Sequence, residues 1–360
     1  MKKNIIVNFI NILVSVIFMV VVFLVKLNPL SLIISFILTL TNVLLAIYSM
    51  GIKEYPEIKL GVFTGSTYLC NGVILLTQML LMIAALSNSL WFSIIALFCV
   101  FVFIKCIMVF NKELFRFLRF HFFVTLTISF STMVLYCILL AYRNWGFKLP
   151  TIASAAIVIV VYVLLTIKEK DVLKITAYSC LFFMALMLLA IGDYKSQGIH
   201  SAILYIISYT PVMFMLLTAG FSIDDAYRDY GVKRIRSVLV HMPIYGAGYF
   251  IGLLAIMGFP PFSLFFGRLS IIQSLITSGD YVRTGLLLVG AVVSSYFVLS
   301  KAMPVLFGSR QTPLLGIRES KYSVVILFFL AVFSLLLTVI IPGFVEGLIS
   351  NARAYVLGVL

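Results

Sequence analysis

Two adjacent prolines, Pro260 and Pro261, interrupt an apolar run in the last third of this chain. A proline lacks the backbone N–H that a helix needs, and its ring clashes with the preceding turn, so a helix that reaches this pair must end and restart. Inside a bilayer, every backbone group without a hydrogen-bond partner is costly. The pair therefore predicts a discontinuous membrane helix that is buried in a bundle or lines a hydrated cavity.

A basic residue follows this break. Arg268 lies about two helical turns beyond the prolines, among Phe265, Phe266 and Leu269. A charged side chain at the centre of a membrane helix costs about 2.5–3.5 kcal/mol on insertion scales. Two alternatives remain open: the guanidinium reaches the interface from a helix end, or it has a partner or a polar cavity within the bundle.

The whole chain is too apolar for a soluble fold. Its 360 residues are 63% hydrophobic and 11% charged, whereas soluble domains have about 45–50% apolar residues. The apolar runs predict an all-α, polytopic membrane helix bundle of about 12 transmembrane helices, some of them discontinuous. The predicted spans are 4–25, 28–50, 61–86, 89–110, 120–142, 150–167, 173–192, 200–221, 239–258, 262–278, 284–307 and 322–345.

No stretch outside these spans is long enough for a soluble domain, so we expect residues 1–360 to form a single transmembrane domain. The first run follows two lysines and has the length of a span. Because it lacks a clean small-residue cleavage site, we expect an uncleaved span and not a signal peptide.

The basic residues support an inside N-terminus. Up to residue 283, the predicted inner segments hold 15 lysines and arginines, whereas the outer loops hold four. The net charge of +14 is therefore no sign of nucleic-acid binding. Arg310, Arg318 and Lys321 fall in a predicted outer loop, so either the span count slips by one near the broken helix or this loop is an exception.

Cofactor motifs are missing from the sequence. The cysteines all lie in apolar runs without Cys-x-x-Cys spacing, and no glycine-rich phosphate loop occurs. We therefore expect no cofactor, no metal site and no redox centre in this chain. The five cysteines are Cys70, Cys99, Cys106, Cys137 and Cys180.

Polar side chains in the first spans are rare. Lys105 has apolar neighbours on every side; it either reaches toward the basic segment 112–119 or is a buried ammonium that changes protonation. Thr125, Ser129 and Thr132 share one helical face. These hydroxyls serve packing and hydroxyl-to-backbone bonding between helices, or they form a stripe that holds water.

Later polar candidates cluster between residues 171 and 211. Asp171 and Lys174 stand at a helix start, where the carboxylate can cap free amides and pair with the ammonium. Tyr205 and Tyr209 share one face, either for packing or as part of a pathway. Pro211 is expected to interrupt the same span and to free carbonyls that bind water.

Several motifs in order resemble the antiporter-like membrane subunits of respiratory complex I, with subunit N as the model, and of the related membrane-bound hydrogenases and Mrp antiporters. The run Gly258-x-Pro-Pro261 with its following phenylalanines is similar to the family's Gly-x-Pro-Pro and aromatic segment. Asp171, Lys174 and the run 177–179 resemble the family's Asp-Ile/Leu-Lys-Arg-Leu-Leu-Ala-Tyr-Ser pattern, and Val292 to Lys301 resembles Val-Ser-Ala-Tyr-Tyr-Tyr-Leu-Arg. The resemblance implies a weakly matching N-terminal half (1–145), an antiporter core (146–310) and a C-terminal loop with the last helix (311–360).

The chain departs from the family's charged pattern. Relatives usually carry lysine or glutamate where Arg268 stands, a glutamate near Leu97 or Phe98, a lysine in the span after Arg119, and a histidine where Phe183 stands. A guanidinium stays protonated, so Arg268 cannot pass a proton as a lysine can, although it can set the local field and hold waters.

The resemblance implies a multi-pass subunit, in a prokaryotic plasma membrane or the mitochondrial inner membrane, that couples electron transfer elsewhere in its complex to proton or sodium translocation. The alternatives are a degenerate, non-conducting spacer or a subunit of a multisubunit cation/proton antiporter. The implied partners are other membrane subunits and the lipid bilayer, with no nucleic acid and no quinone bound by this chain alone. The pathway residues that we predict are Lys105, Thr132, Asp171, Lys174, Tyr178, Tyr205, Tyr209 and Arg268, with helix breaks at Pro211, Pro260 and Pro261.

Overall fold

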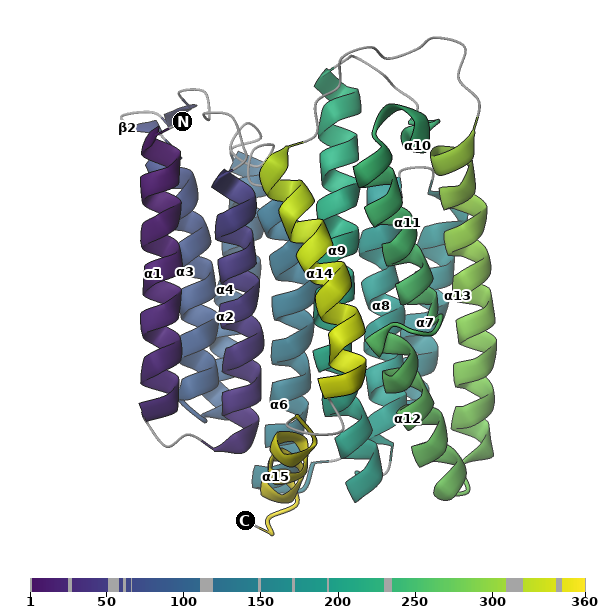
Figure 1. Cartoon of the computed structure of the whole chain (residues 1–360). Helices are drawn as coiled ribbons and strands as arrows, with labels where there is room; N and C mark the ends of the chain where they lie inside the picture. The colour runs from purple at the N-terminus through teal and green to yellow at the C-terminus, as the bar shows by residue number, and fades with distance from the viewer. Residues whose placement is uncertain are drawn as a thin grey trace. The chain divides into compact units, whose positions relative to one another are not determined.

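The computed structural model describes residues 2–24, 28–50, 58–60, 63–65, 67–110, 119–147, 150–169, 172–192, 194–229, 235–308, 320–340 and 345–359 (Figure 1). Almost all of these residues are helical, so the predicted all-α class is confirmed. The exception is one short antiparallel hairpin of strands β1 (Ile58–Leu60) and β2 (Phe63–Gly65).

The helices are α1 (Lys2–Leu24), α2 (Pro29–Met50), α3 (Thr67–Leu86), α4 (Leu90–Phe110), η1 (Thr125–Ser129), α6 (Phe130–Trp145), α7 (Thr151–Lys168), α8 (Val172–Ile191), α9 (Ser196–Asp229), α10 (Val238–His241), α11 (Pro243–Met257), α12 (Ser263–Thr277), α13 (Tyr281–Phe307), α14 (Lys321–Ile340) and α15 (Glu346–Val356). By their internal contacts they form two compact units, which we call unit 1 (residues 1–147 and 354–360) and unit 2 (residues 148–353). The expected division at residues 145 and 310 stays a prediction.

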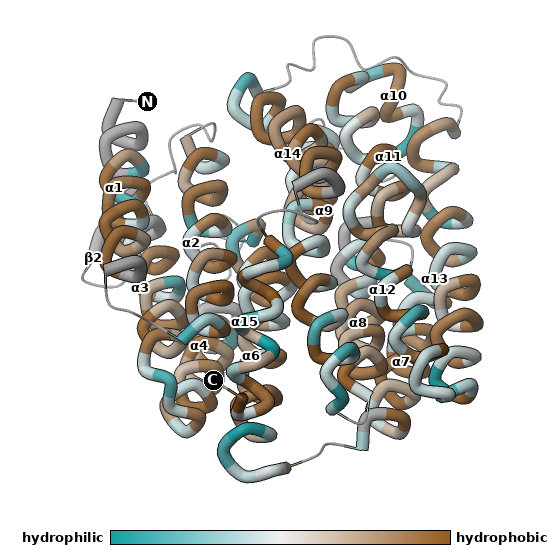
Figure 2. Tube along the Cα trace, turned by 60° about the horizontal axis from the view of Figure 1, so that its bottom comes forward, coloured by the Kyte–Doolittle hydropathy of each residue, from teal (hydrophilic) through white to brown (hydrophobic). Residues whose placement is uncertain are grey.

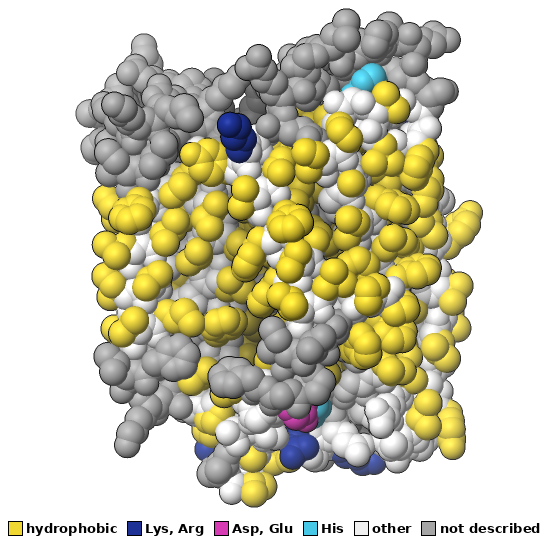
Figure 3. All heavy atoms as spheres, viewed as in Figure 1, with side chains coloured by type: hydrophobic (Ala, Val, Ile, Leu, Met, Phe, Trp, Pro, Cys, Tyr) yellow, Lys and Arg dark blue, Asp and Glu magenta, His cyan; other side chains and the backbone are white. Residues whose placement is uncertain are grey.

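Apolar side chains dominate the helices. Along the Cα trace, hydrophobic residues fill the middle of the helices, and on the face drawn in Figure 3 they also cover the surface (Figures 2 and 3). Among the described residues, five helices are long and apolar enough to cross a membrane. These are Pro29–Met50, Arg119–Trp145, Lys174–Ile191, Ser196–Tyr227 and Tyr281–Phe307.

Unit 1 contains a π-helical segment in the helix Arg119–Trp145. This segment, η1, is held from α3 by Gln78, whose amide nitrogen donates to Thr125 Oγ1 at 2.9 Å and whose amide oxygen accepts from Ser129 Oγ at 3.2 Å. All three side chains are buried. In an apolar interior such a satisfied polar cluster fixes one arrangement of the two helices.

Helix α9 is the central element of unit 2, where α8, α11, α12 and α14 pack around it. We expected Pro211 to interrupt this span, but α9 continues through it from Ser196 to Asp229. An interior proline removes one backbone hydrogen bond, that to the carbonyl of Ile207. The helices packed around this buried stretch hold α9 together despite that loss.

Helices α11 and α12 form a single interrupted crossing of unit 2 (Figure 1). At the start of α11, the Tyr245 hydroxyl accepts from the backbone N–H of Ser320, which directly precedes α14, at 2.6 Å. At the end of α12, Thr277 Oγ1 donates to Gln197 Oε1, near the start of α9, at 2.7 Å. The predicted spans 239–258 and 262–278 are therefore two halves of one crossing.

The pairing of α11 with α12 in one crossing bears on the exception in the charge pattern. Ser237 donates to the backbone oxygen of Gly308, which places the end of α13 beside α10. The start of α14 at Lys321 lies at the same end, together with Arg236. This placement favours the slip by one in the span count at the broken helix, and the inside position of Lys321 stays a prediction. Arg310 and Arg318 lie outside the described residues.

Candidate functional site

The break in the α11–α12 crossing leaves four backbone carbonyls at the end of α11 to be satisfied. Two of them accept from the turn that follows: Gly258 N–H donates to the Ala255 oxygen at 3.0 Å, and Phe259 N–H donates to the Leu254 oxygen at 3.1 Å. The other two accept from Arg268, which donates through Nη1 to Met257 at 2.7 Å and through Nη2 to Ile256. Arg268 thus completes the C-terminal cap of α11.

An arginine suits this position for geometric and electrostatic reasons. The planar guanidinium presents parallel donors that can reach two neighbouring carbonyls, which the point charge of a lysine does less well. A cation also complements the negative end of the helix dipole. Gly258 makes room for the side chain, because a Cβ atom there would lie 3.1 Å from both Arg268 Cδ and Nη1, and its φ of +80° favours glycine.

Arg268 is buried, with 8% of its surface exposed. Of the two alternatives, a guanidinium that reaches the interface or one with a partner inside the bundle, the structure therefore favours the second. The rings of Phe182 and Phe183 lie 5.7 and 5.9 Å from its central carbon, within cation–π range. Among the described residues no carboxylate forms an ion pair with it. Within the described part of the chain, its positive charge is balanced by carbonyl dipoles, aromatic faces and the nearby hydroxyl of Tyr205.

Three buried polar atoms close to the break have no hydrogen-bond partner within the described chain: Arg268 Nε, the Tyr205 hydroxyl and Ser208 Oγ. Tyr205 and Ser208 lie on α9 directly against Gly267, whose Cβ position would be 3.1 Å from Tyr205 Cδ2. Buried polar groups in proteins normally have a partner, so three such atoms together mark a place suited to water.

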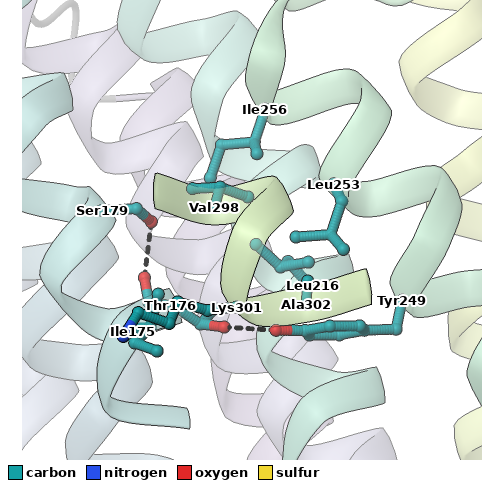
Figure 4. Close-up of a pocket in the computed structure, with 10 residues that line it drawn as sticks. All are labelled: Ile175, Thr176, Ser179, Leu216, Tyr249, Leu253, Ile256, Val298, Lys301 and Ala302. Carbon is teal, nitrogen blue, oxygen red and sulfur yellow. Dashed lines mark hydrogen bonds between the residues drawn. The ribbon is translucent and has the colours of Figure 1, made fainter. Parts of the chain in front are cut away.

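A small cavity lies between the break and the α10 end of unit 2 (Figure 4). Its volume of about 10 Å³ is close to the room that one water needs. Thr176 and Tyr249 share a hydrogen bond of 2.9 Å between their hydroxyls, and Ile256 and Lys301 also line the cavity. The polar groups of this cavity are the hydroxyls of Thr176, Ser179 and Tyr249 and the side chain of Lys301, and the other lining residues are apolar.

A larger cavity lies at the opposite end of unit 2, with a volume of about 230 Å³. The hydroxyls of Ser201 and Ser270, which line it, are 2.9 Å apart. One turn further along α9 lies Tyr205, which contacts Gly267 next to Arg268. The residues that line this cavity are Gln197, His200 and Ser201 from α9, Ser270, Gln273 and Ser274 from α12, and Glu346 and Arg353 from α15.

The structure brings together only part of the predicted pathway set. Tyr205 stacks on Phe183 and Tyr209 contacts the same ring at a tilt of 43°, and this ring lies beside Arg268. Lys174 is exposed and pairs with Glu169 at 3.3 Å, at the start of α8, and Tyr178 is half-buried. Pro260 and Pro261 lie exposed in the turn between α11 and α12.

The remaining predicted residues lie elsewhere. In unit 1, Lys105 is exposed on α4, with its ammonium 5.8 Å from the Phe101 ring. Thr132 is buried and donates to the backbone oxygen of Ile128 at 2.8 Å, as expected for hydroxyl packing within a helix. Asp171 lies outside the described residues.

Sequence reasoning missed several polar residues that the fold gathers. Gln78 had no motif to mark it, Lys301 ended a family-like run but was not selected as a pathway residue, and the pairing of His200 with Glu346 joins residues far apart in the chain. Gly258 did carry a signal, because a glycine directly after an apolar helix is typical of a left-handed C-terminal cap.

Fold and site together define a multi-pass helical membrane protein with an arginine-capped break in one crossing. Residues 120–295 match the family model described as NADH:quinone oxidoreductase/Mrp antiporter, TM. The chain is thus similar to antiporter-like membrane subunits, and the resemblance seen in its motifs is confirmed.

Comparison with curated relatives gives the same kinship. The protein named antiporter subunit mnhD2 from Staphylococcus aureus (strain JH9) is 27% identical over 164 residues, which is 45% of this chain and 32% of that protein. The same figures hold for the mnhD2 protein of strain Newman. The chain therefore spans about a third of the length of the curated relatives that it matches.

Solved structures share the fold at low sequence identity. A chain of the membrane-bound sulfane sulfur reductase, an archaeal respiratory membrane complex, has a TM-score of 0.69 at 14% identity, covering 99% of this chain and 93% of that one. A chain of the Mrp complex from Dietzia sp. DQ12-45-1b gives 0.54 at 15%, covering 91% and 76%. A chain of respiratory complex I from Thermus thermophilus gives 0.52 at 16%, covering 95% and 99%.

Proposed function

We propose that this chain is a subunit of a multisubunit membrane oxidoreductase of the complex I or membrane-bound reductase kind. There it takes part in coupling electron transfer in other subunits to the translocation of protons or sodium ions. The observation that carries the proposal is the break in the α11–α12 crossing, where a buried arginine caps α11, with one cavity that contains polar groups on each side of it.

Arg268 acts in this proposal as a fixed charge. Because its guanidinium stays protonated, it cannot itself pass a proton. Its charge raises the energy of any cation close to the break and orients water beside it, an effect that is strong in a buried site. The break is thus the barrier of the path, and a change of charge elsewhere in the complex would have to lower it.

Hydroxyl groups on each side of the break can conduct protons together with water, because a hydroxyl both donates and accepts hydrogen bonds. Toward the α10 end, Thr176 and Tyr249 stand between the break and Lys301. Toward the other end, Tyr205 and Ser201 stand between the break and the larger cavity. No proton needs to rest on Arg268 in this scheme.

One observation favours a second candidate, the non-conducting spacer. Arginine residues and positive helix ends in pores exclude protons and cations. The positive charge of Arg268 has no carboxylate partner among the described residues. A permanent barrier at Arg268 would leave the chain with a purely structural role in its complex.

A tagged copy of this chain, isolated with its complex from native membranes, tests the proposal. Redox subunits among the co-purifying proteins support the oxidoreductase; other antiporter subunits alone would favour a cation/proton antiporter. The double variant Thr176→Val with Tyr249→Phe removes two hydroxyls at nearly constant shape. We expect fewer ions moved per electron, with electron transfer retained.

The matched control is Thr166→Val, because Thr166 is a buried hydroxyl that donates to its own helix at Tyr162 and does not line the cavity. Its ratio of ions to electrons should equal that of the wild type. An unchanged ratio in the double variant, in a complex that otherwise pumps ions, would support the spacer.

A further inference from the structure

The short helix α15 forms one wall of the 230 Å³ cavity at the end of unit 2. Its Glu346 and Arg353 face residues of α9 and α12 across the cavity. The helix is amphipathic: Ile349 and Ala352 are buried, whereas Asn351 is exposed. Its other end is held by hydrogen bonds of 2.8 and 3.1 Å between Tyr355 and Asn88, so the part that can move as a lid is the start of the helix at Glu346.

A single ion pair joins the start of α15 to α9. Glu346 Oε1 lies 2.9 Å from His200 Nε2, and the histidine side chain is 16% exposed. Arg353 is the other charged group that lines the cavity; the remaining lining residues are serines and glutamines. When the histidine is protonated, a partly exposed ion pair of this kind contributes up to about 1 kcal/mol, enough to hold a lid and weak enough to release it.

The cavity behind this pair leads toward the interior. Ser201 and Ser270 meet at its inner side, and Tyr205, one turn further along α9, reaches Gly267 and the break. The unpartnered buried atoms at Tyr205, Ser208 and Arg268 lie in that direction. At about 30 Å³ per water molecule, the cavity volume is enough for several waters.

We infer that the cavity is a hydrated vestibule of unit 2, that α15 is its lid and that the pair His200–Glu346 is the latch of that lid. The cavity is partly open to solvent, and opening of the latch widens the access of water and small cations from this end to the serine pair. The inference deepens the proposed function and rests on it, because the vestibule is an entrance or exit for ions only if this chain translocates ions. Access to the cavity itself can be measured without any ion pumping.

The test introduces a cysteine inside the vestibule by Ser274→Cys, a small change at a buried lining position. The purified intact complex is treated with a charged thiol reagent, and labelling is read at residue 274 by peptide mass spectrometry, so that the native cysteines do not contribute. Adding Glu346→Gln removes the charge of the latch. We expect labelling to become roughly two- to fivefold faster, the factor that such an ion pair supports.

Two further variants make the result specific. Glu169→Gln removes the carboxylate of the other pair in unit 2, Lys174–Glu169, at a distance from the cavity, and should leave the labelling rate unchanged. His200→Cys combined with Glu346→Cys, oxidised to a disulfide, should slow labelling below the wild-type rate. Equal rates in the wild type, the Glu346→Gln variant and the disulfide variant would overturn the lid.

The experiments distinguish a failure of the lid proposal from a failure of the proposed translocation function. Unchanged labelling in a complex that pumps ions refutes the lid and leaves the translocation function intact. Faster labelling upon Glu346→Gln in a complex where this chain moves no ions supports the lid and refutes the translocation function.

Discussion

The substitution Gly258→Ala tests whether Arg268 depends on the space beside the break. Two costs are expected. An alanine in the left-handed conformation that Gly258 adopts costs about 1–2 kcal/mol. The new Cβ would also lie 3.1 Å from Arg268 Cδ and Nη1, so the guanidinium must move away from the carbonyls that it caps.

The second cost follows from the hydrogen bonds of the cap. A hydrogen bond from a charged donor contributes about 1.5–3 kcal/mol, and a shift of the guanidinium weakens at least one of its two bonds to Ile256 and Met257. We therefore expect Gly258→Ala to lower the free energy of unfolding by about 2.5–5 kcal/mol in total.

Gly279→Ala is the matched control. Gly279 has a φ of +74° at the end of α12, yet a Cβ there would meet nothing within 4 Å. It should cost only the conformational term of about 1–2 kcal/mol. Reversible denaturation of the full chain in detergent measures both variants, and equal losses for Gly258→Ala and Gly279→Ala would refute the cap. In an Arg268→Met background the excess loss of Gly258→Ala should disappear, because the displaced group is gone.

Three other changes test the packing. Gln78→Leu leaves two buried hydroxyls at η1 without their partner, so we expect a loss of about 1–3 kcal/mol in unfolding free energy; no loss would remove the amide's role. Gly198→Ala places a Cβ against the backbone oxygen of Ala190 and should cost about 1–3 kcal/mol, whereas Gly285→Ala, with open space around it, should be neutral or stabilising in the same denaturation assay. Asp280→Ala removes the carboxylate that accepts from the start of α13 and should cost about 0.5–2 kcal/mol; a gain in stability would contradict this.

The interrupted helix was predictable from sequence, because two adjacent prolines allow few other outcomes. The end of α11 at Met257 and the start of α12 at Ser263 follow from Pro260 and Pro261 together with the glycine before them. That the two halves make one crossing was not predictable, since each apolar run alone approaches the length of a span. The basic residues in the loop before Lys321 were the sequence feature that indicated a single crossing.

Contacts between distant residues lay beyond sequence reasoning. The partner of Arg268 is a pair of backbone carbonyls, which any sequence supplies, so no residue type marks it. Pro211 shows the opposite error: local preference predicted a break, but the helices packed around α9 keep it continuous. Lys105 stood out as a charge in an apolar run, yet its place on an exposed face depends on how α4 packs.

The ratio of ions moved to electrons transferred, measured in vesicles that contain the intact complex, tests the central role of Arg268 most directly. Arg268→Lys keeps a positive charge but loses the two-carbonyl cap, and Lys105→Ala serves as the control on an exposed face. We predict that the ratio falls in Arg268→Lys while electron transfer continues, and that it stays at the wild-type value in Lys105→Ala. A wild-type ratio in Arg268→Lys would contradict the account.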